Sequence, residues 1–202
     1  PSVTANTEQW NGTNWTEVNN LNTGRSILAG SGASNTSALA FGGYNNPVGT
    51  YALTELWNGT NWTEVNDMNT PRGGLAGCGT QTAALAFGSI QPVTYHYAET
   101  WNGTNWTIVN DTNSDMGLRG GAGTNTSALA FGGQPYSTGA TESWNGTNWT
   151  ELADLSTARY GPGGAGASNS SALCFAGNIG GPPTTATEEW NLTGGVSTIT
   201  TS

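Results

Sequence analysis

The sequence is poor in charge and poorest in basic residues. Of 202 residues, 13 are acidic, four are basic and one is histidine, which gives a net charge of -9 at pH 7 without any basic cluster. Nucleic acids and anionic membranes are both bound mainly through Lys and Arg. The composition therefore argues against both kinds of partner. No apolar run approaches the length of a membrane span, so we expect no membrane insertion either.

Cysteine is also scarce, with only Cys78 and Cys174. The first interpretation is two small buried thiols, and the alternative is a disulfide between them. No CxxC pair of the zinc type and no Asp-rich loop of the EF-hand kind occurs, so we expect no metal and no cofactor. The chain begins at Pro1 with no signal-peptide pattern, and we expect it to have been processed or excised from something longer.

Large aliphatic residues are few as well, since Leu, Ile, Val and Phe make up about 14% of the chain. That level alone would be typical of a disordered protein. Nine tryptophans and a charged fraction of 8% argue the other way, because tryptophan buries a large area and a disordered chain is usually richer in charge. We therefore expect a folded protein whose core is built from tryptophan and small residues.

What the sequence does have is a repeat of about 45 residues. The segment Trp-Asn-Gly-Thr-Asn-Trp-Thr begins at Trp10, Trp57, Trp101 and Trp144, with a degenerate copy at Trp190. A second element, Ala-Leu-Ala-Phe-Gly or a close variant, contains Phe41, Phe87, Phe131 and Phe175. A period of this length indicates a solenoid, a propeller or an array.

One repeat contains four expected strands, at Ser26–Gly32, Ser37–Phe41, Thr54–Trp57 and Asn61–Val65. Asn58-Gly59 predicts a type I′ turn between the last two. Helical periodicity is absent. The pattern predicts an all-β protein, a β-propeller of four-stranded antiparallel blades.

The repeat resembles a kelch blade, with an arginine before the first strand, Phe-Gly-Gly closing the second, and then a glutamate and two tryptophans. Residues 22–65 carry this set as Arg25, Phe41-Gly42-Gly43, Glu55, Trp57 and Trp62. The amino-acid sequence of the repeats is also similar to that of kelch-like arrays in virion-associated proteins of marine phages. These resemblances imply a propeller on a virion surface or outside a cell.

The repeats do not add up to a whole number of blades. We expect a single domain over residues 1–202, divided into a half-blade at 1–21 and units at 22–68, 69–112, 113–155 and 156–202. Three outcomes stay open: a four-bladed ring with an extra hairpin, a five-bladed ring cut short, or an open edge completed by another subunit. An unpaired strand edge favours assembly.

Charged residues follow the repeat. The arginines precede the first strands, and a glutamate lies two residues before each first tryptophan. We expect structural pairs formed by Arg25, Arg72, Arg119 and Arg159 with Glu55, Glu99, Glu142 and Glu188. The alternative is a set of cationic groups at the axial opening that binds carboxylates or acidic sugars.

The least repeated segments are the four loops between second and third strands, at 44–51, 90–97, 134–139 and 178–185. Strand reversal places them on the same face as the arginine-bearing connections. Variable loops on a rigid scaffold commonly carry binding function. The candidate ligand-binding residues are Tyr44, Tyr51, Tyr95, His96, Tyr97 and Tyr136.

These observations favour a non-catalytic interaction module, displayed on a virion or outside a cell, that binds a glycan or protein through the loop face. The alternative is a structural virion or assembly subunit, in which the half-blade terminus contacts further copies or neighbouring virion proteins. An enzyme would need a placed pair of carboxylates or an activated nucleophile. The sequence offers neither, so we nominate no catalytic residue and no metal ligand.

Overall fold

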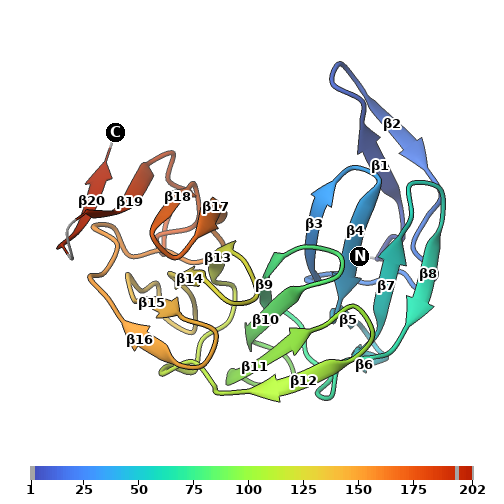
Figure 1. The fold of residues 1–202 in the computed structure, drawn as a ribbon, viewed down its shortest axis with the longest axis horizontal. Coiled ribbons are helices and arrows are strands. Elements are labelled where there is room, and N and C mark those ends of the chain that lie inside the picture. The colour runs from blue at the N-terminus through green and yellow to red at the C-terminus, as the bar shows by residue number, and fades with distance from the viewer. Residues whose placement is uncertain (1–2, 194–195, 202) are drawn as a thin grey trace.

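The computed structural model describes residues 3–193 and 196–201. Every regular element in this part of the chain is a β-strand, and all pairings between named strands are antiparallel. Four four-stranded sheets are arranged as the blades of a β-propeller (Figure 1). The predicted fold class is therefore confirmed.

Each blade is a meander in which consecutive strands pair in order. The blades are β3 (Ala29–Ser34), β4 (Ser37–Phe41), β7 (Thr54–Trp57) and β8 (Trp62–Val65); β9 (Ala76–Gly79), β10 (Ala84–Ser89), β11 (Tyr95–Trp101) and β12 (Trp106–Val109); β13 (Gly120–Gly123), β14 (Ala128–Phe131), β15 (Thr141–Trp144) and β16 (Trp149–Glu151); and β17 (Gly163–Ser168), β18 (Ser171–Phe175), β19 (Thr187–Thr193) and β20 (Val196–Thr201).

Two further hairpins complete the fold. The strands β5 (Tyr44–Asn45) and β6 (Gly49–Thr50) form a short hairpin in the loop between β4 and β7 of the first blade. At the N-terminus, β1 (Thr7–Trp10) pairs with β2 (Trp15–Val18). This half-blade packs beside the first blade in the position of a preceding blade's third and fourth strands. Trp62 Nε1 of the first blade donates a hydrogen bond to Thr7 Oγ1 of the half-blade. In the same way, Trp106 Nε1 of the second blade donates to Thr54 Oγ1 of the first.

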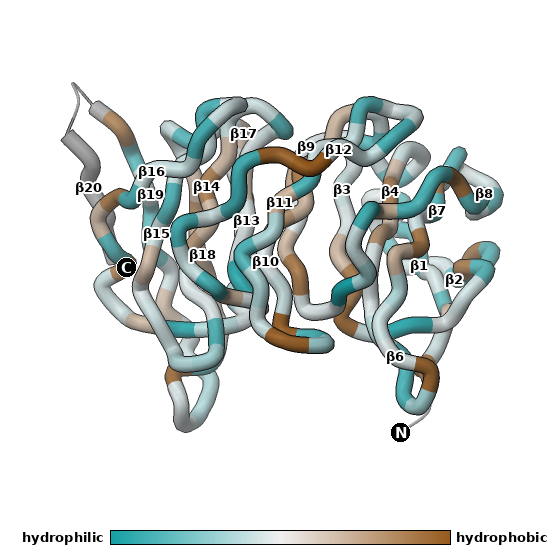
Figure 2. Tube along the Cα trace, turned by 90° about the horizontal axis from the view of Figure 1, so that it is seen from below, coloured by the Kyte–Doolittle hydropathy of each residue, from teal (hydrophilic) through white to brown (hydrophobic). Residues whose placement is uncertain are grey.

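The first strands of the blades stand next to one another around the middle of the molecule. β3 contacts β9, β9 contacts β13, and β13 contacts β17. Their glycine- and alanine-rich segments line a central groove of about 800 Å³. Figure 1 shows that the arc is open between the fourth blade, which holds the C-terminus, and the half-blade. In Figure 2 the strongly hydrophilic segments lie mostly in the turns at the edges of the blades.

The core consists of the layers between neighbouring blades. In the first two blades, the phenylalanine of the second strand packs edge-on against the fourth-strand tryptophan of the next blade: Phe41 against Trp106 at 4.9 Å and 60°, and Phe87 against Trp149 at 5.2 Å and 61°. Aromatic pairs prefer this geometry. Small residues in the first strands make room for the rings, because a Cβ on Gly77 would lie 2.5 Å from the Phe41 ring.

The turn between third and fourth strands differs from the predicted type I′ turn. Four residues separate Trp57 from Trp62, and of these Gly59 alone has a positive φ, of 92°. The Asn58 carboxamide oxygen accepts hydrogen bonds from the backbone N–H groups of Thr60 and Asn61. Asparagine therefore serves here as a turn acceptor rather than as a residue with positive φ.

The first strands begin later than expected. β3 starts at Ala29 instead of Ser26, because Ile27 has a φ of 45° and interrupts the extended chain. Ser26 instead forms an isolated bridge with Tyr44. The second and third strands of this blade match their predicted bounds.

The cysteines are free and buried, which is the first of the two interpretations drawn from the sequence. Burial raises the pKa of the Cys78 thiol to about 12. The pKa of Cys174 rises to about 11, again chiefly through burial, with Arg159 and Glu188 nearby. Both thiols are therefore protonated at neutral pH.

Candidate ligand-binding face

The variable loops and the arginine-bearing connections lie on one face of the propeller. Isolated bridges join the two kinds of segment in each blade: Ser26 with Tyr44, Gly73 with Gln91, Gly117 with Gln134, and Tyr160 with Asn178. The connection into a blade thus anchors the base of that blade's own loop. A loop held this way is a rigid platform for side chains near its ends.

Buried ion pairs hold the same connections against the blades. The arginine and glutamate approach to 2.6 Å in Arg25–Glu55 and Arg119–Glu142, 3.2 Å in Arg72–Glu99 and 2.5 Å in Arg159–Glu188. The other oxygen of each glutamate accepts a backbone N–H of the same connection, as in Asn22 N to Glu55 Oε2 at 2.7 Å; the other donors are Asn69, Asn113 and Ser156. Each pair therefore ties a connection to a third strand.

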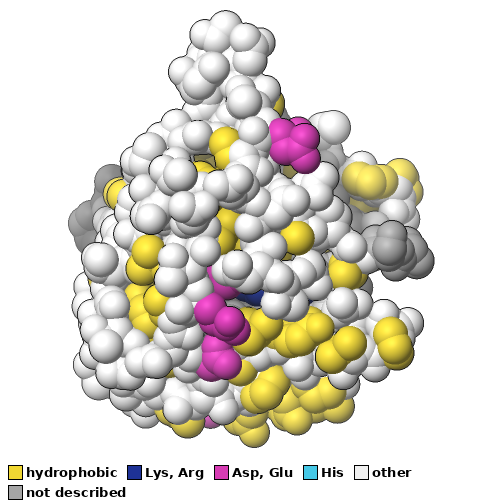
Figure 3. Space-filling view, turned by 90° about the vertical axis from the view of Figure 1, so that its right-hand side faces the viewer, with side chains coloured by type: hydrophobic (Ala, Val, Ile, Leu, Met, Phe, Trp, Pro, Cys, Tyr) yellow, Lys and Arg dark blue, Asp and Glu magenta, His cyan; other side chains and the backbone are white. Residues whose placement is uncertain are grey.

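These arginines are not available to a ligand. Their side chains are fully buried, and desolvation lowers the pKa of Arg72 and of Arg119 despite the nearby Glu99 and Glu142. Figure 3, a view of the side near the half-blade and β8, shows acidic side chains at the surface and only a small recessed spot of arginine. The alternative of an accessible cationic ring is therefore wrong.

The tyrosines of the second blade lie in a strand rather than in a loop. Tyr95, His96 and Tyr97 belong to β11, which is longer than its counterparts β7 and β15. The cause is Ser89, which stands where the first and third blades have a second glycine, pairs with Tyr95 across a bulge, and donates its hydroxyl to the carbonyls of Gln91 and Val93.

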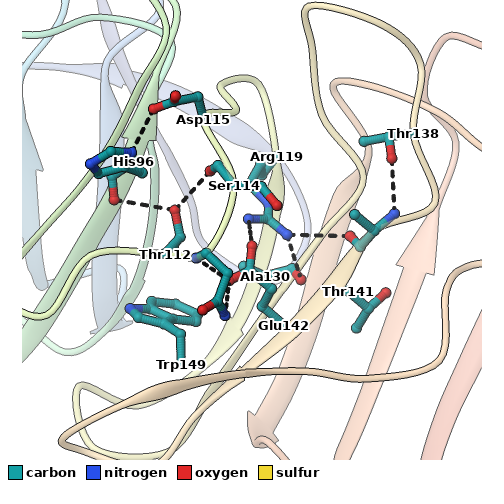
Figure 4. Close-up of polar contacts among 12 residues, drawn as sticks. His96, Thr112, Ser114, Asp115, Arg119, Ala130, Thr138, Thr141, Glu142 and Trp149 are labelled. Atoms are coloured by element: carbon teal, nitrogen blue, oxygen red, sulfur yellow. Dashed lines mark hydrogen bonds and ion pairs between the residues drawn. The ribbon is translucent and has the colours of Figure 1, made fainter.

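His96 lies between two carboxylates. Its Nδ1 is 2.6 Å from Asp115 Oδ1 and its Nε2 is 3.4 Å from Asp111 Oδ2. Its backbone oxygen accepts hydrogen bonds from the N–H and hydroxyl of Thr112. Figure 4 shows Asp115 and Thr112 reaching His96 from the connection between the second and third blades, next to the Arg119–Glu142 pair. The imidazole keeps 42% of its side-chain surface exposed.

Two aromatic rings stand beside this histidine. Tyr95 and Tyr97 are stacked with centroids 4.6 Å apart and planes 18° from parallel, and His96 meets Tyr97 edge-on at 5.6 Å. The three rings are therefore neighbours at the start of β11. All three residues are partly exposed.

The other candidates belong to different blades. Tyr44 lies in β5 and Tyr51 follows β6, and both are half-buried, whereas Tyr136 in the third blade is 83% exposed. Among the described residues, no hydrogen bond or ring contact joins these three to the β11 cluster. The structure brings together only half of the predicted ligand-binding set.

Sequence reasoning missed Asp111 and Asp115 as partners of His96. Asp111 follows the fourth strand at the same repeat position as Asp67, and both accept a backbone N–H of the third strand, from Ala98 and Thr54 respectively. Because it occupies a repeated position, the sequence alone suggests only a structural role for Asp111. Asp115 has no counterpart in the other repeats, and its departure from the pattern was the one usable signal.

The cluster can accept and donate hydrogen bonds and offers an aromatic surface. Within the described part of the chain, the imidazole contacts carboxylates and no hydroxyl or thiol. No group of three or more His, Cys, Asp or Glu side chains there is arranged to hold a metal ion. A search of the described residues for a long, apolar helix that could cross a membrane finds none.

The fold is thus an all-β propeller in which the variable loops lie beside the arginine-bearing connections. Comparison with protein-family models finds no match to this chain, and comparison with curated proteins finds none either.

Proposed function

We propose that this protein is a non-catalytic, kelch-like interaction module, displayed on a virion or outside a cell, that binds a glycan through the Tyr95–His96–Tyr97 cluster. The observation that carries the proposal is the exposed His96 held by Asp111 and Asp115 on a scaffold that otherwise repeats itself. Ordering a polar side chain before binding reduces the entropy lost on binding.

The chemistry of the cluster suits a neutral or amino sugar. Carboxylates and an imidazole bond to hydroxyl and amine groups, and tyrosine rings pack against apolar C–H faces. An acidic sugar fits less well, because Asp111 and Asp115 would repel it and the arginines are buried. A protein surface with exposed hydroxyl or amine groups is the other class of partner.

The proposed site has no catalytic role. Glycoside hydrolysis uses two carboxyl groups on either side of the scissile bond, whereas both aspartates here are engaged by one histidine. Incubating the bound oligosaccharide with the protein and analysing it by mass spectrometry tests this point. Cleavage products would refute a non-catalytic module.

The binding test uses an array of neutral and amino-sugar oligosaccharides, followed by calorimetric titration of the strongest binder. We expect His96→Gln and Asp115→Asn each to weaken binding at least tenfold, since each removes a charged or oriented group from the contact. Ile108→Ser is the matched control, because Ile108 is 62% exposed on β12 of the same blade. Equal binding by all three variants would overturn the proposed site.

A further inference from the structure

The two interfaces that join the first three blades share one packing pattern. The second-strand phenylalanine of one blade packs edge-on against the fourth-strand tryptophan of the next, in Phe41–Trp106 and Phe87–Trp149. The third strands of the half-blade and the first blade carry Thr7 and Thr54, and each threonine hydroxyl accepts the indole N–H of the fourth-strand tryptophan of the following blade. Each of the first three blades therefore has two different faces, a phenylalanine face and a tryptophan face, whereas the half-blade has no such phenylalanine and the fourth blade no fourth-strand tryptophan.

At the C-terminal end, the phenylalanine face of the fourth blade is uncovered. Phe175 and Leu173 are 40% and 42% exposed, whereas their counterparts Phe41 and Leu39 in the first blade are 0% and 1% exposed. Thr187, at the position of Thr54, lies on the same face and is only half-buried. The hydrophobic pair and the hydroxyl acceptor of an interior interface are both present here without a neighbouring blade.

At the N-terminal end, the tryptophan face of the half-blade is uncovered. Trp10 and Trp15 are 42% and 65% exposed, while Trp101 and Trp106, which stand at the same repeat positions, are 1% and 6% exposed. The indole N–H of Trp15 takes part in none of the hydrogen bonds found among the described residues. This end offers the half of the interface that the other end lacks.

We propose that the two ends bind each other between copies, so that the fourth blade of one protomer packs on the half-blade of a second copy of this chain. Phe175 then meets Trp15 edge-on, and the Trp15 indole donates to Thr187, repeating the interior interface. The occupant is a second copy because the uncovered surfaces are the two halves of one recurring interface. In Figure 1 they lie on opposite sides of the opening.

Such a contact is head-to-tail, because it joins two different surfaces. Head-to-tail contacts generate rings when the rotation closes and open filaments when it does not. The contact goes beyond the proposed glycan site, since none of its residues lies in β11. It would also correspond to the alternative function expected from the sequence, an assembly subunit whose half-blade contacts further copies.

Charge opposes this association. Glu8 and Glu17 lie on the outer face of the half-blade and are exposed, and Glu189 is exposed on the fourth blade. All four arginines are buried, so no basic side chain of the described residues offsets these charges. Added salt screens repulsion between exposed charges. Association therefore grows as salt rises from about 20 to about 300 mM, the range over which the Debye length shrinks severalfold.

The test is sedimentation velocity on residues 1–202 over a wide range of protein concentration at both salt levels. We expect species larger than 20.7 kDa whose share rises with concentration and with salt. Phe175→Ser and Trp15→Ser each remove one end and leave monomers. Mixing the two variants restores one interface and stops at a dimer. Ile108→Ser, again exposed but far from both ends, assembles like the parent chain.

Several outcomes would overturn the inference. These are a monomer at every concentration and salt level, variants that assemble as well as the parent, or a mixture of the two variants that stays monomeric. Near-ultraviolet circular dichroism of each variant shows whether it is folded. Because both side chains are exposed, we expect native spectra, and a misfolded variant is replaced by the milder Phe175→Leu or Trp15→Leu.

Discussion

Gly77 tests the interface rule most directly. It lies in β9, and a Cβ added there would meet the Phe41 ring at 2.5 Å, closer than any ordinary carbon contact. The ring is completely buried and packs against Trp106, so it cannot move aside freely. Overpacking of this kind typically lowers the free energy of unfolding by about 1–3 kcal/mol. A Gly→Ala change also restricts the unfolded chain, which raises the free energy of unfolding by about 0.4–1 kcal/mol.

Gly77→Ala should therefore lower the free energy of unfolding by about 1–2 kcal/mol, or the melting temperature by about 2–8 °C for a chain of this size. The matched control is Gly30→Ala. Gly30 has the same place in the first blade, but its preceding blade is only a half-blade, and the nearest atom to its Cβ is the Leu39 carbonyl oxygen at 3.2 Å. We expect that change to stay within about 0.5 kcal/mol.

The assay is urea unfolding followed by tryptophan fluorescence, together with a thermal scan. The double variant Gly77→Ala with Phe41→Leu isolates the contact, since removing the ring should relieve most of the added cost of the Cβ. If Gly77→Ala and Gly30→Ala were equally stable, or if Phe41→Leu gave no relief, ring-against-glycine packing would not be what holds the blades together.

Three other expectations follow from the buried Arg119–Glu142 pair and the buried Cys78 thiol. Glu142→Gln should destabilise the fold by about 3–5 kcal/mol because it leaves Arg119 buried without its charge partner, whereas Glu8→Gln should have little effect because Glu8 is exposed; equal effects in thermal unfolding would refute this. Native Cys78, with its pKa raised to about 12, should resist alkylation at pH 8 until the chain unfolds. Above about pH 9 only the unfolded thiol loses its proton, so the free energy of unfolding should fall with rising pH, as a urea titration at pH 8 and pH 10 would reveal.

The repeat made the fold predictable. The second strand ending at Phe41 and the third strand ending at Trp57 match their predicted bounds, because each alternates between two blade interfaces and carries the repeated side chains. The first strand was harder to bound. Its glycines carry no pattern of their own, and its start is set by Ile27 with a positive φ and by pairing with the neighbouring loop.

The candidate site was less predictable because it depends on departures from the repeat. The extension of β11 rests on Ser89, a single non-glycine residue whose hydroxyl bonds to the following loop. The partners of His96 come from 15 and 19 residues further along the chain. Distances of this kind are set by the packing of two blades, and residue types alone do not specify them.

Neighbouring blades of this protein pack through repeated side chains. Stability in such arrays is close to a sum of repeat and interface terms, and terminal repeats need polar outer faces to remain soluble as monomers. Here the terminal faces keep Phe175, Leu173, Trp10 and Trp15, the residue types that are buried in the interior. In the described structure, the repetition that makes the blades alike therefore also leaves these apolar side chains exposed on the two outer faces. The side chains around His96 do not follow the repeat, so the proposed ligand site and the proposed self-association surfaces belong to different parts of the molecule.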